Sequence, residues 1–490
     1  MDKIIKTSIW LTLSELAFNI SGYIIHSVLG RFLGPAEYGR FSLIITFSTM
    51  IIVLIGRGIP ISMSKFLSEI PQEKSNEILF IKQQAIRLQL IVISAITILY
   101  FLAAPFFAKL LRDESLTDLF RFSSLIIPSF AIAAFYISYF NGIHHFNQQA
   151  FLKFVRAGAR VSFILGLGYL YKTGGAIIGQ ALAPLSVLAV ALFIDPYKKV
   201  KTGFKKTKEE ITQINKKILN FAWPITLFLV FYELMITIDL YLVKAILRDD
   251  HLTGLYNSAL TVGRIPYYVF YFLSILLLPK ISNTVAQKME EQTKRIMTVS
   301  FRFMLMLLIP SVFLLSYFAP SAIRFFYGAA YTEAAAAMSV LSFGFGFLTV
   351  FYIITFVLNG AGKNKIPMYL SIFGAVLNTF LNFFFISRWG IIGSAIATSI
   401  TAFIILVPAV IYTSRNICSF LQTNSIIKYF LASGLVYLIA IRFFPQGHFV
   451  FFVWGAILMM IYFAILSILL EIKKADWHKF YNLIFKKNKS

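Results

Sequence analysis

Four arginines lie deep inside apolar stretches of the sequence: Arg57, Arg156, Arg160 and Arg264. A buried arginine costs several kcal/mol in lipid, so such a residue usually faces a bundle interior or a water-filled cavity. Arg156 and Arg160 are one helical turn apart and therefore share a face of one helix. Because a guanidinium donates two parallel hydrogen bonds to phosphate oxygens, these arginines predict a cationic cavity that binds an anionic substrate.

Three acidic residues also lie well inside predicted helices: Glu15, Glu233 and Asp239. An isolated buried carboxyl group is either protonated near neutral pH or paired with a cation. Two roles therefore stay open for these acids, namely coupling to H⁺ or Na⁺ and structural ion pairs with the deep arginines. Cys418 is the only cysteine, and no spacing of Cys and His indicates a metal site.

The composition defines the elements that position these residues. Of the 490 residues, 58% are hydrophobic and 13% are charged, whereas about 25% of the residues in a soluble domain are charged. This balance excludes a soluble enzyme, a disordered chain and a coiled coil, and it predicts an all-α polytopic membrane protein. Apolar runs long enough for a membrane span predict fourteen helices, at residues 8–30, 41–64, 85–110, 119–140, 151–171, 176–195, 218–243, 254–279, 299–321, 332–360, 367–387, 390–412, 425–443 and 449–470.

The distribution of basic residues predicts the orientation. The net charge of +24 arises from 45 Lys and Arg against 21 Asp and Glu. Ten basic residues fall in the loops that follow odd-numbered helices, and 28 fall on the other side. Since cytoplasmic loops carry the excess of Lys and Arg, both termini are predicted to be cytoplasmic. Orientation and attraction to anionic membrane lipids explain the charge without a nucleic-acid partner.

Short sequence matches indicate an internal repeat. Two dipeptides recur with an offset of 218, Asn-Gly at 141 and 359 and Glu-Leu at 15 and 233. Gly39 and Gly254 match with an offset of 215, and the segments 177–181 and 391–395 match with an offset of 214. Each copy holds six helices, so the two copies have the same orientation in the membrane, as in transporters built from parallel repeats.

The repeat divides the chain into four predicted parts. Residues 1–197 form an N-terminal lobe of helices 1–6, and 198–217 form a basic cytoplasmic connector. Residues 218–415 form a C-terminal lobe of helices 7–12, and 416–490 hold helices 13 and 14 and a basic cytoplasmic tail. The predicted fold is therefore two six-helix lobes in parallel repeat plus two C-terminal helices.

Three segments resemble a known family. The segment 31–41 (RFLGPAEYGRF) resembles the helix 1–2 region of polysaccharide-biosynthesis flippases, 56–60 (GRGIP) resembles the end of their second helix, and 254–259 (GLYNSA) is similar to their helix 8 opening. Together with fourteen helices in a six-plus-six-plus-two arrangement, they indicate the multidrug/oligosaccharidyl-lipid/polysaccharide exporter superfamily.

The resemblance implies a two-lobed transporter in a bacterial or archaeal cytoplasmic membrane. Such flippases move undecaprenyl-diphosphate-linked oligosaccharide to the outer leaflet by alternating access. They serve O-antigen, capsule or exopolysaccharide assembly, so polymerase and assembly proteins are expected as partners. The diphosphate is thought to bind basic cavity residues, which is compatible with the arginines above. No cofactor is expected.

Three alternatives stay open. A flippase for the peptidoglycan precursor lipid II would also have fourteen helices and a basic interior. A multidrug/cation antiporter is disfavoured, because it usually has twelve helices and a cationic cavity repels cationic drugs. A membrane enzyme of glycan synthesis is disfavoured, because no loop is long enough for a catalytic domain. We therefore expect a transporter and not an enzyme.

Overall fold

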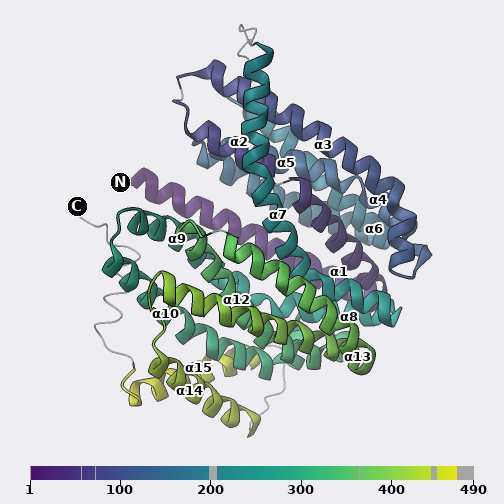
Figure 1. Cartoon of the computed structure of the whole chain (residues 1–490). Coiled ribbons are helices and arrows are strands. Elements are labelled where there is room, and N and C mark those ends of the chain that lie inside the picture. Colours follow the sequence, from purple (N-terminus) through teal and green to yellow (C-terminus); the bar gives the residue numbers. More distant parts are fainter. Residues whose placement is uncertain are drawn as a thin grey trace. The chain divides into compact units, whose positions relative to one another are not determined.

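The computed structural model describes residues 2–56, 58–71, 73–197, 207–363, 365–442 and 450–471. These residues form fifteen α-helices and two short 3-10 helices, which confirms the predicted all-α fold (Figure 1). Nine helices in the described ranges are long and apolar enough to cross a membrane. The predicted fourteen do not appear as fourteen separate helices, because some predicted spans are joined in one helix and others are divided between two.

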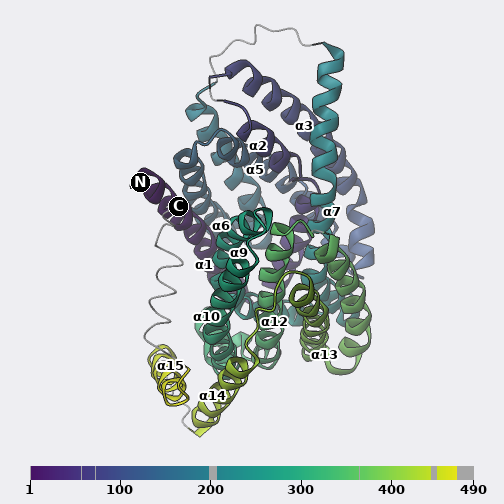
Figure 2. The same ribbon diagram turned by 60° about the vertical axis from the view of Figure 1, so that its left-hand side comes forward.

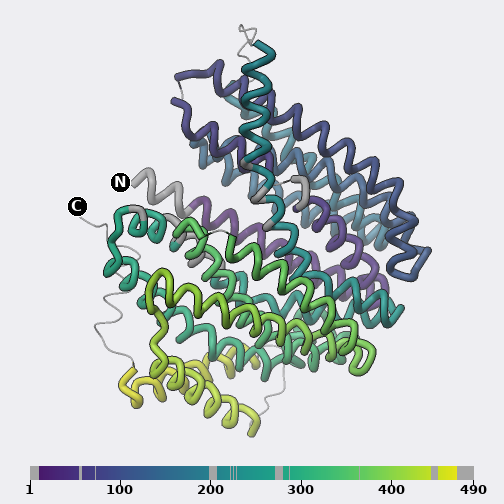
Figure 3. The backbone as a smooth tube through the Cα atoms, in the orientation of Figure 1, coloured from purple at the N-terminus to yellow at the C-terminus, as the bar shows by residue number. Residues whose placement is uncertain are grey.

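Contacts divide the chain into two compact units, Met1–Gly254 and Leu255–Ser490. The first unit contains α1 (Asp2–Gly56), α2 (Gly58–Ser68), α3 (Ser75–Leu110), η1 (Glu114–Leu116), α4 (Thr117–Ser123), α5 (Ile126–Gly142), α6 (Phe146–Ile194), α7 (Lys208–Leu247) and the start of α8 (Asp250–Gly263). The second contains the rest of α8, α9 (Ile265–Ala286), α10 (Glu290–Tyr317), α11 (Ala319–Tyr327), η2 (Ala329–Tyr331), α12 (Ala334–Gly360), α13 (Lys365–Asn416), α14 (Thr423–Arg442) and α15 (Val450–Ile468). Figure 3 follows the backbone through them.

Helix α6 is a hairpin of two predicted spans. An unbroken helix of its 49 residues would be about 74 Å long, more than twice the ~30 Å hydrocarbon core of a membrane. The backbone instead leaves helical geometry at Tyr171 and Lys172. A Cβ atom on Gly175 would lie 2.0 Å from the carbonyl oxygen of Leu167, so the two arms touch through their backbones beside the turn.

Helix α13 repeats this hairpin 218 positions later. Its backbone turns at Gly390 with φ 56° and ψ −136°, and Lys172 in α6 has φ 51° and ψ −138°. A Cβ atom on Gly393 would lie 2.0 Å from the carbonyl oxygen of Phe385, which is the same backbone approach as in α6. The second hairpin therefore supports the predicted parallel repeat.

The structure corrects one detail of that repeat. Gly175 of α6 corresponds to Gly393 of α13. Each of these glycines lies three residues after the residue at which the backbone turns, Lys172 or Gly390. A Cβ atom on each would meet the carbonyl oxygen of the residue eight positions earlier. The predicted match of 177–181 with 391–395 paired Gly179 with Gly393 and is wrong. An offset of 218 therefore applies to this hairpin too.

Helix α1 contains a third reversal. Gly34 has φ 75° and ψ 169°, a conformation that glycine adopts without a steric penalty, and Pro35 follows it. Across the bend, Nδ1 of His26 lies 2.9 Å from the hydroxyl oxygen of Tyr38. Helices α1, α6 and α13 thus each hold residues of two predicted spans.

The helix after the basic connector begins earlier than predicted. The backbone N–H of Glu210 donates to Oγ1 of Thr207 at 3.2 Å, and the backbone N–H of Thr207 donates to Oε2 of Glu210 at 2.9 Å. This capping box satisfies N–H groups that a helix start leaves without partners. Helix α7 therefore begins at Lys208, and residues 208–217 of the predicted connector are helical.

The α6 hairpin generates a first prediction. Gly175→Ala forces a Cβ atom against a carbonyl oxygen, and we expect a loss of about 1–3 kcal/mol of stability, as in other overpacked sites. The neighbouring Gly174→Ala is the matched control, since nothing lies within 4 Å of its Cβ position. Thermal unfolding of the detergent-purified variants measures the difference. Equal stability of the two variants would show that the arms are not in contact.

Candidate functional site

Helices α1 and α6 pack side by side in the first unit (Figure 1), and α6 carries two of the predicted site residues, Arg156 and Arg160. Side chains of α1 contact α6 at Trp10, Glu15 and Phe18. Trp10 meets the ring of Phe154 edge-on, with 5.6 Å between ring centroids. Glu15 forms an ion pair with Lys153. One turn further along α1, Phe18 lies beside the two arginines of α6.

Arg156 and Arg160 share one aromatic ring. The guanidinium carbon of Arg156 lies 4.8 Å from the centroid of Phe18, and that of Arg160 lies 4.5 Å from the same centroid. Arg156 also lies 4.0 Å from the ring of Phe130 on α5 and is only 8% exposed. Cations over aromatic faces gain about 0.5–2 kcal/mol. The prediction that Arg156 and Arg160 share a helix face is confirmed, and Phe18 faces both.

Arg264 lies in the second unit, at a break between two helices. Helix α8 ends at Gly263 and α9 begins at Ile265, so Arg264 is the N-cap residue. Its guanidinium carbon lies 5.4 Å from the ring of Phe345 on α12. Again an arginine lies beside an aromatic ring.

The fourth predicted arginine, Arg57, lies outside the described residues. Its sequence context still matches that of Arg264. Gly-Arg-Gly-Ile-Pro at 56–60 and Gly-Arg-Ile-Pro at 263–266 share Gly-Arg followed by Ile-Pro. Helix α1 ends at Gly56 and α2 begins at Gly58. The two arginines are 207 positions apart, which differs from the offset of 214–218 that the other repeat matches share.

The three predicted acids occupy different surroundings. Glu15 pairs with Lys153 of α6. Lys153 is one of the 28 basic residues that the sequence assigned to the cytoplasmic side, so this pair was not predicted. Glu233 lies on α7, where its backbone carbonyl accepts a hydrogen bond from Oγ1 of Thr237 at 2.7 Å. Asp239, six residues later on α7, is completely buried, and its carboxylate accepts the backbone N–H of Leu240 at 2.8 Å.

A second ionic group lies in the first unit where α7 ends and α8 begins. Nζ of Lys244 lies 2.7 Å from Oδ2 of Asp113 and 2.5 Å from Oδ1 of Asp250. Burial raises the pKa of Asp113, but hydrogen bonds from Lys244 and Ser115 outweigh it, so its pKa lies below the ordinary value. Asp113 therefore stays ionised near neutral pH. The sequence placed Lys244 in a loop after an odd-numbered helix and did not indicate this ionic group.

A third ionic group joins α3 to the end of α6. Lys82 is 9% exposed and pairs with Asp195, which is 4% exposed. The hydroxyl of Tyr139 donates to Oδ1 of Asp195 at 3.1 Å, and its ring lies 4.2 Å from Nζ of Lys82. Lys82, Tyr139 and Asp195 all precede the basic connector in the sequence, so this group does not join segments from both sides of the connector.

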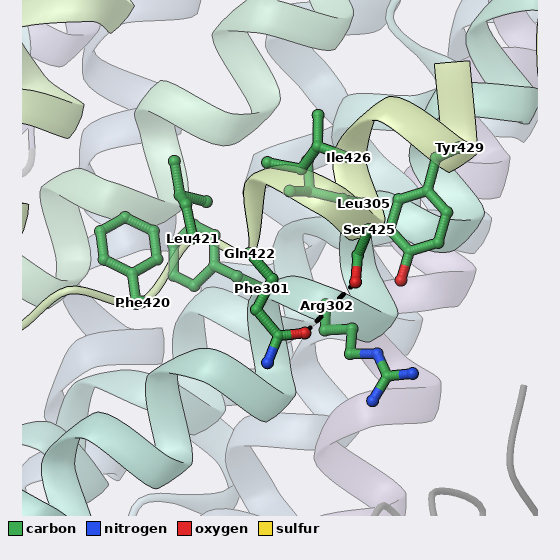
Figure 4. A pocket seen from close by; sticks show the side chains of 9 residues that line it. All are labelled: Phe301, Arg302, Leu305, Phe420, Leu421, Gln422, Ser425, Ile426 and Tyr429. Atoms are coloured by element: carbon green, nitrogen blue, oxygen red, sulfur yellow. Dashed lines mark hydrogen bonds between the residues drawn. The ribbon is translucent and has the colours of Figure 1, made fainter. Parts of the chain in front are cut away.

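The second unit has a small pocket between α10 and α14 (Figure 4). Arg302 and Ser425 are among its lining residues. The Arg302 side chain donates from Nη2 to the backbone oxygen of Glu471 at 2.6 Å and from Nε to its carboxylate at 3.2 Å. Lys428 donates to the same carboxylate at 3.1 Å. These bonds attach the chain after α15 to α10 and α14, which lie beside each other in Figure 2.

The fold is that of membrane transporters. The chain superimposes on the lipid II flippase MurJ in an inward closed conformation with a TM-score of 0.75 and 20% identity, over 95% of this chain and 98% of that one. It superimposes on an inward-facing multidrug resistance MATE family transporter of the MOP superfamily with a TM-score of 0.67 and 15% identity, over 88% and 99% of the two chains.

The family is defined by sequence. The family described as "Polysaccharide biosynthesis protein" matches residues 4–285, and the MatE family matches 224–384. The chain is 24% identical to the uncharacterized membrane protein MJ1375 of Methanocaldococcus jannaschii, over 84% of this chain and 99% of that protein. It is 24% identical to stage V sporulation protein B of Bacillus subtilis over 80% of each. The chain belongs to the polysaccharide biosynthesis protein family, as its sequence motifs predicted.

The shared ring of Phe18 generates a second prediction. Phe18→Leu keeps an apolar side chain but removes the aromatic face beside both arginines. We expect a coupling energy of about 0.5–1 kcal/mol between Phe18 and Arg160, measured by a double-mutant cycle of thermal or denaturant unfolding. Phe151→Leu, at an exposed position of α6, is the control and should show no coupling to Arg160. A coupling of zero for Phe18 would show that the ring does not hold the guanidinium.

Proposed function

We propose that the protein is a flippase that moves undecaprenyl-diphosphate-linked oligosaccharide from the cytoplasmic to the outer leaflet by alternating access, for assembly of cell-surface polysaccharide. The observation that carries the proposal is the cluster of cations on one face of α6. Lys153, Arg156 and Arg160 lie within about two turns of that helix, and Lys153 forms an ion pair with Glu15 on α1.

The chemistry of the cluster suits a diphosphate. Two guanidiniums one turn apart present several N–H donors to phosphate oxygens, and a ring shared by both limits their side-chain freedom. Preorganised donors lose less entropy when the ligand binds. The exposed sides of the spanning helices are apolar, as at Leu102 and Phe106 of α3, so a polyprenyl tail can stay in lipid while the headgroup is bound.

Family membership and fold support the same substrate class. A polysaccharide biosynthesis family points to a lipid-linked glycan, and the similar MurJ structure is named as a flippase of lipid II. Lipid II is therefore the second candidate substrate. Both lipids share the polyprenyl diphosphate that the cationic cluster would bind, and they differ in the glycan.

Orientation and partners complete the proposal. The excess of basic residues on one side supports cytoplasmic termini in a bacterial or archaeal cytoplasmic membrane. Anionic lipids would contact these basic segments, and polymerase and assembly proteins would receive the translocated glycan. The lobes 1–197 and 218–415 would be the moving parts, and Arg57 and Arg264 would join Arg156 and Arg160 in binding the substrate.

Reconstituted vesicles test the function. The protein is incorporated into liposomes with a fluorescent undecaprenyl-diphosphate-linked glycan, and the fraction of lipid that an external quencher reaches is followed over time. Each lost charge-assisted hydrogen bond is worth about 1.5–3 kcal/mol. We therefore expect Arg156→Ala with Arg160→Ala, and separately Arg264→Ala, to slow transfer by at least about tenfold.

Arg295→Ala with Arg388→Ala is the matched control, because both of these arginines are exposed. This variant should transfer lipid at the wild-type rate. Equal rates for the wild type and for the Arg156/Arg160 variant would contradict the cationic mechanism. Transfer of fluorescent lipid II in place of the oligosaccharide lipid would favour the second candidate.

Coupling to H⁺ or Na⁺ through the acids inside the helices is a separate part of the proposal. Asp239 is the strongest candidate, because it is completely buried on α7. We expect Asp239→Asn to abolish the stimulation of lipid transfer by an imposed H⁺ or Na⁺ gradient. Glu15→Gln should retain that stimulation, because Glu15 already pairs with Lys153. Full stimulation of the Asp239 variant would exclude it as the coupling site, and Glu233 would then be tested in the same way.

A further inference from the structure

Helices α7 and α8 meet the earlier part of the chain through a closed ring of polar contacts. Lys244 bridges the carboxylates of Asp113 and Asp250. Nε of Arg40 donates to Asp250 at 2.8 Å, and its Nη2 donates to Oγ of Ser115 at 2.6 Å. The hydroxyl of Ser115 donates to Asp113 at 2.6 Å, which closes the ring.

The ring joins segments from both sides of the basic connector. Arg40, Asp113 and Ser115 belong to α1 and to the turn between α3 and α4, whereas Lys244 and Asp250 belong to α7 and α8. Two ion pairs cross between these segments, Arg40 with Asp250 and Lys244 with Asp113. The positions all fall in loops that follow odd-numbered predicted helices, so the ring lies at one face of the membrane.

The backbones beneath the ring are in direct contact. A Cβ atom on Gly39 would lie 2.1 Å from the carbonyl oxygen of Asp250, and one on Gly254 would lie 1.9 Å from that of Pro35. No side chain fits in this position, so the two segments approach as closely as backbones can. Both glycines are members of the predicted repeat.

Aromatic rings pack between the same two segments further along α1. The ring of Phe47 lies 5.4 Å from that of Tyr241 on α7 and 5.2 Å from that of Phe120 on α4. Tyr241 and Phe120 are both buried. The seam between the two segments is therefore sealed by ion pairs, by glycine backbones and by aromatic rings.

We propose that Arg40, Asp113, Lys244 and Asp250 form an ion-pair latch that closes this face of the transporter and separates when the protein changes state. Lys244 is 2% exposed, and a lysine that loses its carboxylate partners in such a place is strongly unfavourable. A buried ion pair adds little net stability over apolar packing, because water solvates the separated charges well. The unfavourable cost of an unpaired Lys244 keeps the seam closed. When the seam opens, it exposes charged groups that water solvates and little apolar surface.

The pair of Lys82 and Asp195 provides a contrast. It is buried to a similar degree as Lys244, but its partners all precede the connector. Opening along the seam between α1 and α7 would leave this pair intact. Loss of Lys82 should therefore destabilise the protein without changing access at the latch, which makes Lys82→Met a matched control.

Cysteine labelling in lipid nanodiscs tests the latch, because both membrane faces are then in water. Cys418, the only cysteine in the sequence, is replaced by serine, and Ser42→Cys, 1% exposed in the wild type, serves as the reporter. We expect Lys244→Met to raise the rate of maleimide labelling at position 42 by at least about tenfold, since breaking a buried ion pair favours the open state. Lys82→Met should leave that rate unchanged.

Arg40→Gln and Asp250→Asn are milder variants in case Lys244→Met does not fold, and each should raise the labelling rate by a smaller factor. Unchanged labelling in the folded latch variants would overturn the proposal, as would an equal increase in Lys82→Met. The assay contains no substrate and is independent of the proposed lipid. Failure of the latch and failure of the flippase proposal are therefore distinguishable.

Discussion

The cost of a charge inside an apolar bundle is the constraint on which the rest of this structure depends. Only 13% of the residues are charged, and those within the helices need partners, because an isolated ion is poorly tolerated there. The described residues show two kinds of solution. Lysines are held by carboxylates, as at Lys82, Lys153 and Lys244, whereas Arg156, Arg160 and Arg264 lie over aromatic rings.

The two solutions suit different tasks. A carboxylate neutralises its lysine, so an ion pair joins helices but offers little charge to a ligand. An aromatic face stabilises a guanidinium electrostatically, and a guanidinium can donate parallel hydrogen bonds to phosphate oxygens. We therefore assign a binding role to the arginines of α6 and a closing role to the ring around Lys244. The repeated hairpins of α6 and α13 provide the close-packed scaffold that holds such groups in place.

The sequence was sufficient for the fold class and the family. Length, apolar runs and the recurrence at 218 positions predicted an all-helical repeat protein, and the segment 31–41 indicated its family. The sequence was not sufficient to predict which side chains form ion pairs between helices, because these pairs depend on how the helices pack. Lys153 was counted as an orientation charge and pairs with Glu15. Lys244 was assigned to a loop and is buried between two carboxylates. The similar contexts of Arg57 and Arg264 are 207 positions apart, so they lie outside the offset of 214–218 that indicated the repeat.

The central claim is that the arginines of α6 bind a polyprenyl diphosphate through its charge. Equilibrium binding of undecaprenyl diphosphate to the detergent-purified protein tests this most directly, with uncharged undecaprenol as the reference ligand. The account predicts that Arg156→Ala with Arg160→Ala weakens binding of the diphosphate by at least about tenfold, because two charge-assisted contacts are lost, and leaves binding of undecaprenol unchanged. Equal affinity of the wild type and this variant for the diphosphate would contradict it.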